Sequence, residues 1–232
     1  MKQLLFVIII SVLLTGCTAR PVEDADHTDT LDSEAIITET VPTPDPLTVS
    51  ELAVEDFMLP FDRFSWEREY PPEYVMIHFT SAIMTAPDNP FDISEVRSIF
   101  EELEVSINYI IERDGTVRCY IPENRAAWHA GKGSYKDIEK LTDSMNRYSI
   151  GIELVAIGSK KDMSVYMTDE EYDLLRCESG FTDAQYEALV PLVKDICERN
   201  GIPYTKENVI GHCEYKPEKT DPGELFDWDR LF

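Results

Sequence analysis

The sequence has few basic residues and few histidines, and it lacks paired cysteine motifs. Its 232 residues include 21 lysines and arginines against 45 aspartates and glutamates, and the formal net charge is −24 at pH 7. The phosphates of a nucleic acid would repel a chain this acidic, so nucleic acid is excluded as a substrate. None of the five cysteines belongs to a CxxC pair, which argues against a zinc cluster held by thiolates.

The N-terminal segment has the pattern of a secretion signal. Lys2 precedes the apolar run Leu4–Leu14, which is shorter than the roughly 20 residues that span a membrane as a helix. Residues 14–17, Leu-Thr-Gly-Cys, resemble the lipobox of bacterial lipoproteins. The resemblance implies a signal peptide over residues 1–17, acylation of Cys17 and an extracytoplasmic protein anchored by lipid to a bacterial membrane. The alternative is an uncleaved N-terminal anchor with an incidental cysteine.

Residues 18–66 are predicted to form a disordered tether. Residues 18–60 hold eleven acids and the single base Arg20, together with Pro42, Pro44 and Pro46. Such a composition buries too little apolar surface to offset the entropy lost on ordering. The folded domain is therefore predicted over residues 67–232, as a monomer, with residues 159–181 as an insertion of no assigned function. Its four cysteines are expected to be free, although their even number leaves disulfide pairing open.

Apolar periodicity predicts alternating strands and helices within this domain. Asp114-Gly115 between two apolar runs is a hairpin signal, and Thr182-Asp183 marks a helix start. Strands are predicted over residues 74–79, 105–112, 116–121, 148–155 and 208–212, and helices over residues 92–103, 169–175 and 182–200. The expected fold class is α/β, a central mixed β-sheet flanked by helices.

Two histidines stand at strand ends. His78 ends the first predicted strand and His212 ends the last, and Asp221 follows nine positions later. Two imidazoles and one carboxylate form a hydrolytic zinc site that leaves a fourth position for water, whose pKa bound zinc lowers to about 7. The pattern predicts Zn²⁺ as a cofactor.

Two further residues have the chemistry that amide hydrolysis needs. Glu153, at the end of a strand containing Gly151, is a candidate to accept the proton of water and pass it to a leaving amine. Lys219 is a candidate to stabilise an oxyanion. A histidine at a strand end is more often structural than a ligand, and Glu153 alone could be a surface carboxylate. Spacing alone leaves these alternatives open.

Four motifs in order resemble those of type 2 N-acetylmuramoyl-L-alanine amidases, a zinc amidase fold shared with peptidoglycan recognition proteins. They are residues 77–80, 125–131, 146–153 and 211–223, and the resemblance covers about residues 70–232. It implies His78, His212 and Asp221 as zinc ligands, Glu153 as acid and base, and Lys219 as oxyanion partner. The implied reaction cleaves the amide between the lactyl group of N-acetylmuramic acid and L-alanine, in peptidoglycan or muropeptides, during cell-wall turnover or remodelling.

The resemblance also implies residues that line the substrate groove: Arg125, Ala127, Trp128, His129 and Asn146. For His129, a buried hydrogen-bonded histidine and a fourth zinc ligand are the alternatives. Ser144 stands where relatives that bind a diaminopimelate carboxylate often have a basic residue, with Arg147 or Lys140 as candidates to replace it.

Two other functions compete with hydrolysis. Members of this fold that only recognise peptidoglycan keep the groove and lose metal ligands, so a non-catalytic peptidoglycan-binding lipoprotein is one alternative. The other is a structural lipoprotein whose metal stabilises folding, which predicts a closed four-ligand site and a dispensable Glu153.

Overall fold

Strands and helices alternate along residues 53–175 and 179–232, the parts of the chain that the computed structural model describes. The strands are β1 Val54–Asp56, β2 Ser65–Glu67, β3 Tyr74–Thr80, β4 Tyr109–Ile111, β5 Val117–Cys119, β6 Arg125–Ala127, β7 Ser149–Val155 and β8 Val209–Gly211. The α-helices are α1 Phe61–Phe64, α2 Ile93–Leu103, α3 Met145–Tyr148, α4 Lys160–Met163, α5 Asp169–Leu175, α6 Asp183–Asn200 and α7 His212–Tyr215. Short 3₁₀ turns cover Glu139–Leu141 and Trp228–Arg230.

The main sheet is mixed and has the strand order β1-β5-β4-β7-β3-β8. β3 pairs in parallel with both β7 and β8, and β4 extends the parallel part. β5 runs antiparallel to β4, which confirms the hairpin predicted from Asp114-Gly115. Gly115 has φ +89°, a left-handed conformation that glycine adopts without strain. The predicted fold class, a mixed sheet flanked by helices, is confirmed.

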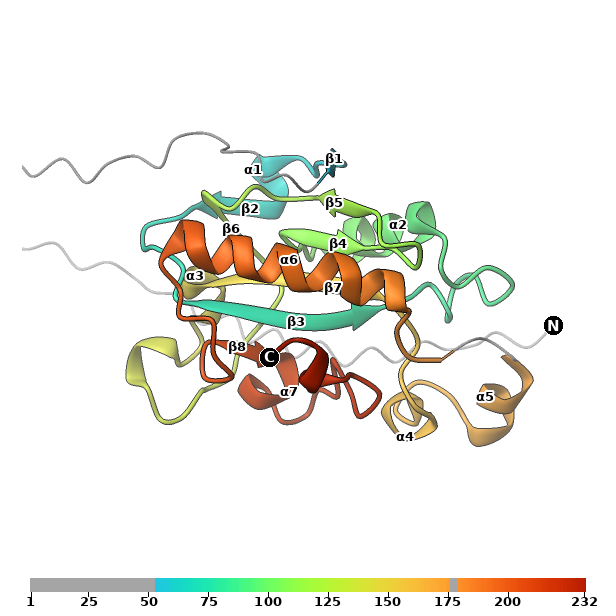
Figure 1. Ribbon diagram of the computed structural model, residues 1–232. Coiled ribbons are helices and arrows are strands. Elements are labelled where there is room, and N and C mark those ends of the chain that lie inside the picture. Colours follow the sequence, from blue (N-terminus) through green and yellow to red (C-terminus); the bar gives the residue numbers. More distant parts are fainter. Residues whose placement is uncertain (1–52, 176–178) are drawn as a thin grey trace, which may run out of the picture. The chain divides into compact units, whose positions relative to one another are not determined.

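The long helix α6 covers one face of the sheet (Figure 1). Thr182 caps its first turn by accepting from the Gln185 backbone N–H at 3.1 Å, and Gly201 ends it in a left-handed conformation. The main apolar cluster lies between this helix and alternate residues of the central strands: Val75, Ile77, Ile150, Ile152, Leu154, Leu189, Val193 and Ile196. Because strand side chains alternate, residues 76, 78, 151 and 153 face away from α6.

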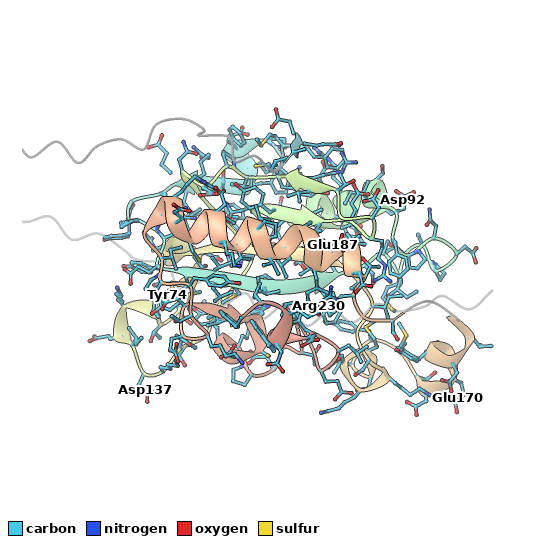
Figure 2. All side chains as sticks on the ribbon, viewed as in Figure 1. Tyr74, Asp92, Asp137, Glu170, Glu187 and Arg230 are labelled. Carbon is cyan, nitrogen blue, oxygen red and sulfur yellow. The ribbon has the colours of Figure 1, made fainter. Side chains whose placement is uncertain are left out.

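Three smaller apolar clusters accompany the α6 cluster within the described residues, and two of them lie around α2 and around Met76. One joins Val96 and Phe100 of α2 to Ile107, Ile110 and Tyr120. The other joins Met76 to residues of the 135–148 segment and β8 (Tyr135, Leu141, Met145, Ile210). In Figure 2, Tyr74 marks the start of β3 and Asp92, which caps α2, lies at the opposite end of the sheet.

The predicted tether boundary is too late along the chain. Residues 54–66, assigned to the tether, form β1, α1 and most of β2, and β1 pairs in parallel with β5. Leu59 and Phe64 are each only 1% exposed, and the Arg97 guanidinium donates to the carbonyls of Phe57 and Met58 at 2.9 and 3.0 Å. The acidic composition of residues 18–60 concealed an apolar block at its end, which has enough hydrophobic surface to fold. Residues 1–52, including Cys17, lie outside the described residues.

The structure also tests the predicted helix at 169–175, the end of the last strand and the state of the cysteines. The predicted helix at 169–175 is present as α5. The last strand ends at Gly211 and not at residue 212, because His212 begins the short helix α7. Cys119, Cys197 and Cys213 are free, as expected, while Cys177 lies outside the described residues. Across residues 53–175 and 179–232, no helix has both the length and the apolar character of a membrane span.

Candidate functional site

Strand register brings three of the predicted residues into one row. His78 of β3 pairs directly with Glu153 of β7. On the other side of β3, Ile77 pairs with Gly211, the residue before His212. Parallel strands in this register place Glu153, His78 and His212 side by side at the carboxyl ends of three neighbouring strands, on the face opposite α6.

Asp221 completes a cluster of possible metal ligands. Its Oδ2 atom lies 2.7 Å from His78 Nδ1 and 3.0 Å from His212 Nδ1. One ligand atom from each of the three residues lies within 4.8 Å of the others, so they could hold one metal ion. The backbone carbonyl of Asp221 accepts from the Cys213 N–H at 3.0 Å, and this hydrogen bond fixes the loop.

The protonation states of His78 and Asp221 suit the binding of a divalent metal ion. Burial lowers the pKa of His78 to about 4, against the opposing effect of its hydrogen bond with Asp221. Burial alone would raise the pKa of the Asp221 carboxyl, but hydrogen bonds from His212 and His78 outweigh burial and hold that pKa below its usual range. At neutral pH His78 is therefore neutral and Asp221 is charged, the protonation states that a divalent metal requires.

The far nitrogens of both imidazoles are also occupied. His78 Nε2 lies 2.9 Å from His129 Nδ1, and His212 Nε2 lies 3.0 Å from the Ala130 carbonyl oxygen. His129 Nε2 lies 3.2 Å from Ser149 Oγ, whose hydroxyl donates to the Met145 carbonyl at 2.7 Å. If His129 Nε2–H donates to Ser149, its Nδ1 accepts from His78 Nε2–H and leaves the His78 Nδ1 lone pair for a metal.

Asn146 and Gly151 fix the position of His129. Asn146 Oδ1 accepts from the backbone N–H groups of His129 and Ala130, at 3.1 and 2.8 Å. At Gly151 a Cβ atom would lie 2.8 Å from His129 Cγ and 2.4 Å from Ile107 Cδ1. Glycine at 151 therefore leaves the space that the imidazole ring of His129 and the side chain of Ile107 occupy.

Within the part of the chain that the structure describes, Glu153 Oε2 is buried without a hydrogen-bond partner. Burial raises the pKa of Glu153 well above its usual value, the neighbouring charge of Asp221 raises it further, and Lys219 opposes both. A carboxyl whose pKa is raised in this way binds a proton more tightly than a free glutamate does, as suits an acid–base group.

A cavity of about 310 Å³ opens over these residues and contains side chains from all parts of the cluster. Its lining includes His78, Glu153, His212, Lys219 and Asp221. Five of the predicted residues, from distant parts of the sequence, thus meet around one cavity.

Comparison with known proteins identifies the family. A family model described as N-acetylmuramoyl-L-alanine amidase (Amidase_2) matches residues 68–224, more than half of the chain. The chain belongs to this amidase family.

The relatives of this chain include amidases named AmpD and AmiD. The chain is 39% identical over 130 residues to the 1,6-anhydro-N-acetylmuramyl-L-alanine amidase AmpD of Citrobacter freundii, and the match covers 56% of each chain. It is 33% identical over 165 residues to the N-acetylmuramoyl-L-alanine amidase AmiD of Escherichia coli K12, covering 68% of this chain and 51% of that protein. The chain thus spans about half the length of the curated relatives it matches.

Solved structures of amidases share the fold. A selenomethionine derivative of AmpD aligns with a TM-score of 0.53 and 28% identity, covering 76% of this chain and 92% of that one. AmiD from E. coli in complex with the substrate anhydro-N-acetylmuramic acid-L-Ala-D-γ-Glu-L-Lys aligns with a TM-score of 0.53 and 30% identity, covering 70% of this chain and 57% of that one.

The predicted groove residues of this amidase domain divide into two groups. Trp128 and His129 line the cavity. Arg125, Ala127 and Asn146 are not part of that lining. Arg125 donates to Ser65 Oγ at 2.7 Å and Ala127 is buried in β6, so both belong to the pairing of β2 with β6.

The basic residues considered for a stem-peptide carboxylate are engaged elsewhere. Arg147 forms an ion pair with Glu69 at 2.7 Å and Lys140 with Glu73 at 2.6 Å. Neither lines the cavity.

Several residues of the amidase site were not predicted from the sequence. Ser149 supports His129, and Ser106 positions Trp128 by accepting from its backbone N–H at 2.7 Å. Nothing in the sequence distinguishes these serines from others, since their role depends on distant partners. Sequence reasoning also missed the apolar cavity lining: Ile83, Met84, Ile99, Leu103, Met163 and Tyr166.

Proposed function

We propose that this protein is a zinc-dependent amidase that hydrolyses the bond between the lactyl group of N-acetylmuramic acid and L-alanine in muropeptides. The observation that carries the proposal is the convergence of His78, His212 and Asp221 beside Glu153 in one cavity. Membership of the amidase family supports it, as do relatives named for this reaction. The substrate named in the AmiD complex, an anhydro-muramoyl tripeptide, is the probe of choice.

The donor set fits zinc. His78 Nδ1, His212 Nδ1 and Asp221 Oδ2 supply two nitrogens and one oxygen, and each imidazole has a hydrogen-bond partner at its other nitrogen. When bound there, zinc would supply a Lewis acid that polarises the scissile carbonyl and makes water more acidic.

In this proposal Glu153 transfers the proton and Lys219 stabilises the charge that develops. Glu153 takes a proton from the attacking water, and the C–N bond then breaks as the same proton passes to the nitrogen of L-alanine. Burial and the neighbouring Asp221 support this role because they raise the Glu153 pKa. Lys219, which lines the same cavity, stabilises the negative charge that develops on the carbonyl oxygen.

We propose a positioning role for His129 and Asn146 in place of the substrate contacts expected from sequence. Both ring nitrogens of His129 have protein partners, His78 and Ser149. Asn146 supports the two residues, His129 and Ala130, that contact the histidine ligands. This arrangement fixes the orientation of both imidazoles before a metal binds.

Incubation of the purified protein with the anhydro-muramoyl tripeptide tests the proposal. Mass spectrometry should detect free L-Ala-D-γ-Glu-L-Lys and anhydro-N-acetylmuramic acid, a chelator should stop their release, and added zinc should restore it. Glu153→Gln should retain zinc yet lose about 10²–10⁴-fold in rate. Tight binding of the muropeptide without product release by the zinc-loaded protein would favour the non-catalytic binding alternative.

We further propose that Cys17 carries a lipid anchor and that the domain acts as a monomer outside the cytoplasm, in wall turnover or remodelling. The lipobox-like residues 14–17 support the anchor. Metabolic labelling with a palmitate analogue should mark the wild-type protein and not Cys17→Ala. Label retained by Cys17→Ala would contradict the anchor.

A further inference from the structure

Part of the segment 159–181, which was predicted as an insertion of no assigned function, extends beyond the carboxyl end of β3. The structure describes its residues 159–175 and 179–181, which include α4 and α5 (Figure 1). An isolated β-bridge joins Ile157 to Gly180. In Figure 2, Glu170 of α5 lies at the opposite end of the domain from Tyr74. The extension therefore lies at the same end of the sheet as His78, Glu153 and His212.

A buried carboxylate joins α4 to the loop of Asp221. Asp162 is 5% exposed, and its Oδ2 accepts from the Ser159 N–H at 3.0 Å, the Ser159 hydroxyl at 2.8 Å and the Glu224 N–H at 3.2 Å. A Cβ atom at Gly223 would lie 2.6 Å from this same oxygen. The charged hydrogen bonds and the glycine contact hold α4 against the residues that follow Asp221.

Apolar contacts fix the other side of α4. Met163 is 3% exposed and packs in a cluster with Ile83 and Ile157, against which Phe79 and Tyr172 also pack. The Tyr172 hydroxyl donates to the Gly158 carbonyl at 3.0 Å. α4 is thus held from two sides and forms part of the folded domain.

The extension supplies one wall of the catalytic cavity. Met163 and Tyr166 line the cavity together with Ile83 and Met84. Tyr166 is 49% exposed, which leaves its ring available for contact with a ligand. The neighbouring Val165, 66% exposed, is not part of the lining.

The chemistry of this wall distinguishes between the two halves of a muropeptide. All four wall side chains, Ile83, Met84, Met163 and Tyr166, are uncharged. The stem peptide carries the free carboxylate of D-γ-Glu, which an apolar wall would desolvate without compensation. The muramoyl sugar is uncharged while its lactyl group is in amide linkage, and its C–H faces and acetyl methyl suit apolar and aromatic side chains.

We propose that Met163 and Tyr166 bind the muramoyl sugar of the substrate and that segment 159–168 is a specificity wall of the site. The proposal rests on the proposed amidase function. The wall contributes ground-state binding and leaves the chemistry to the row of His78, Glu153 and His212.

Steady-state kinetics with the anhydro-muramoyl tripeptide test the wall. Tyr166→Ala should raise KM about five- to tenfold, because an aromatic contact is lost, and leave kcat within about twofold. Tyr166→Phe keeps the ring and should bring KM back to within about threefold of the wild-type value. Val165→Ala is the matched control, an exposed neighbour outside the lining, and should leave both constants unchanged.

Product inhibition identifies the half of the substrate that is bound. Tyr166→Ala should weaken inhibition by anhydro-N-acetylmuramic acid and leave inhibition by L-Ala-D-γ-Glu-L-Lys as in the wild type. Weakened inhibition by the peptide instead would overturn the assignment to the sugar, and an unchanged KM would overturn the wall itself.

Failure of the wall can be separated from failure of the amidase proposal. If the wild-type protein cleaves the substrate and Tyr166→Ala has an unchanged KM, only the wall is wrong. If the wild-type protein does not cleave it, the amidase proposal fails. Calorimetric binding of anhydro-N-acetylmuramic acid to wild-type protein and Tyr166→Ala then still tests the wall: weaker binding by the variant supports it and equal binding overturns it.

Discussion

Burial of the Glu153 carboxyl destabilises the fold, which agrees with the catalytic role proposed for it. Its buried Oε2 atom has no hydrogen-bond partner within the described residues, and burial raises its pKa well above the usual value. A buried carboxyl without full hydrogen bonding destabilises the folded state, and its ionised form does so more strongly. Such a residue is expected where reactivity, and not stability, determines the side chain.

The first prediction follows from the sign of that pKa shift. The folded protein holds the Glu153 proton more tightly than the unfolded chain does, so stability falls as pH rises above about 4.5, where the unfolded carboxyl ionises. In chelator-treated protein, Glu153→Gln should therefore be more stable than wild type at pH 7 by about 1–2 kcal/mol and no more stable at pH 4. Thermal melts across this pH range measure the difference.

Glu187→Gln provides the matched control, because Glu187 is exposed on α6 (Figure 2). It should show no stability difference that grows with pH. The lowered pKa of His78, about 4, has the opposite effect, since stability then falls as pH drops from about 6.5 towards 4. That effect is common to wild type and Glu153→Gln and cancels in the comparison. A stability gain of Glu153→Gln that is equal at pH 4 and pH 7 would contradict the assigned pKa direction.

The second prediction concerns the hydrogen bond between His129 and His78. His129→Ala removes the acceptor at 2.9 Å from His78 Nε2 and should weaken zinc binding about 10- to 100-fold. His129→Asn should recover part of the affinity, because its side-chain oxygen can take the place of Nδ1. Competition with a zinc-chelating dye gives the affinities. Wild-type affinity in His129→Ala would refute the positioning role.

Residue identities were predictable from sequence, whereas the contacts of some residues were not. His78, His212, Asp221, Glu153 and Lys219 stand in motifs, and the structure brings all five to one cavity. The environment of His129 depends on Ser149, Asn146 and Gly151, which approach it from other elements. No local pattern reports a hydrogen bond between side chains on different elements.

At the scale of elements, the central sheet aligns the site through the register of β3 with β7 and β8. Apolar periodicity predicted all three strands, and their ends were predicted to within two residues. The register was not predicted, because it depends on pairing between segments far apart in the sequence. It is this register that pairs His78 with Glu153.

The third prediction tests the packing of β7 against His129. Gly151→Ala would place a methyl group 2.8 Å from His129 Cγ and 2.4 Å from Ile107 Cδ1, so both side chains must shift. We expect a stability loss of about 1–3 kcal/mol and weaker zinc binding in the same variant. Gly201→Asn is the control, because no atom lies within 4 Å of an added Cβ there and asparagine tolerates a left-handed helix end. Unchanged zinc affinity in Gly151→Ala would separate β7 packing from the metal site.

The fourth prediction tests the N-terminal boundary. A protein that begins at residue 53 should keep the stability of the full chain, whereas one that begins at residue 61 should lose about 2–4 kcal/mol. The shorter protein lacks β1, the buried Leu59 and the carbonyls that accept from Arg97. Equal melting temperatures for the two truncations would contradict a structural role for residues 54–60. This segment was not predicted to fold because acidic neighbours dominated its average composition.

At the scale of the whole molecule, one end of the sheet carries both the candidate metal ligands and the apolar wall. The carboxyl ends of β3, β7 and β8 supply His78, Glu153 and His212. The extension that follows β7 supplies an apolar wall of the same cavity. His78, Glu153 and His212 were predicted from the family motifs. The sequence did not predict the wall, because Met163 and Tyr166 lie in a polar, acidic segment. The contact of Met163 with Ile83 and the position of both side chains at the cavity depend on the folded chain.

The fifth prediction is the most direct test of the central claim, that one zinc ion held by His78, His212 and Asp221 drives muropeptide hydrolysis. Metal-free protein is titrated with zinc, and the rate of release of L-Ala-D-γ-Glu-L-Lys is measured at each addition. The rate should rise linearly from near zero and level off at one zinc ion per chain. A rate that does not depend on zinc, or one that still rises well beyond one equivalent, would contradict the account.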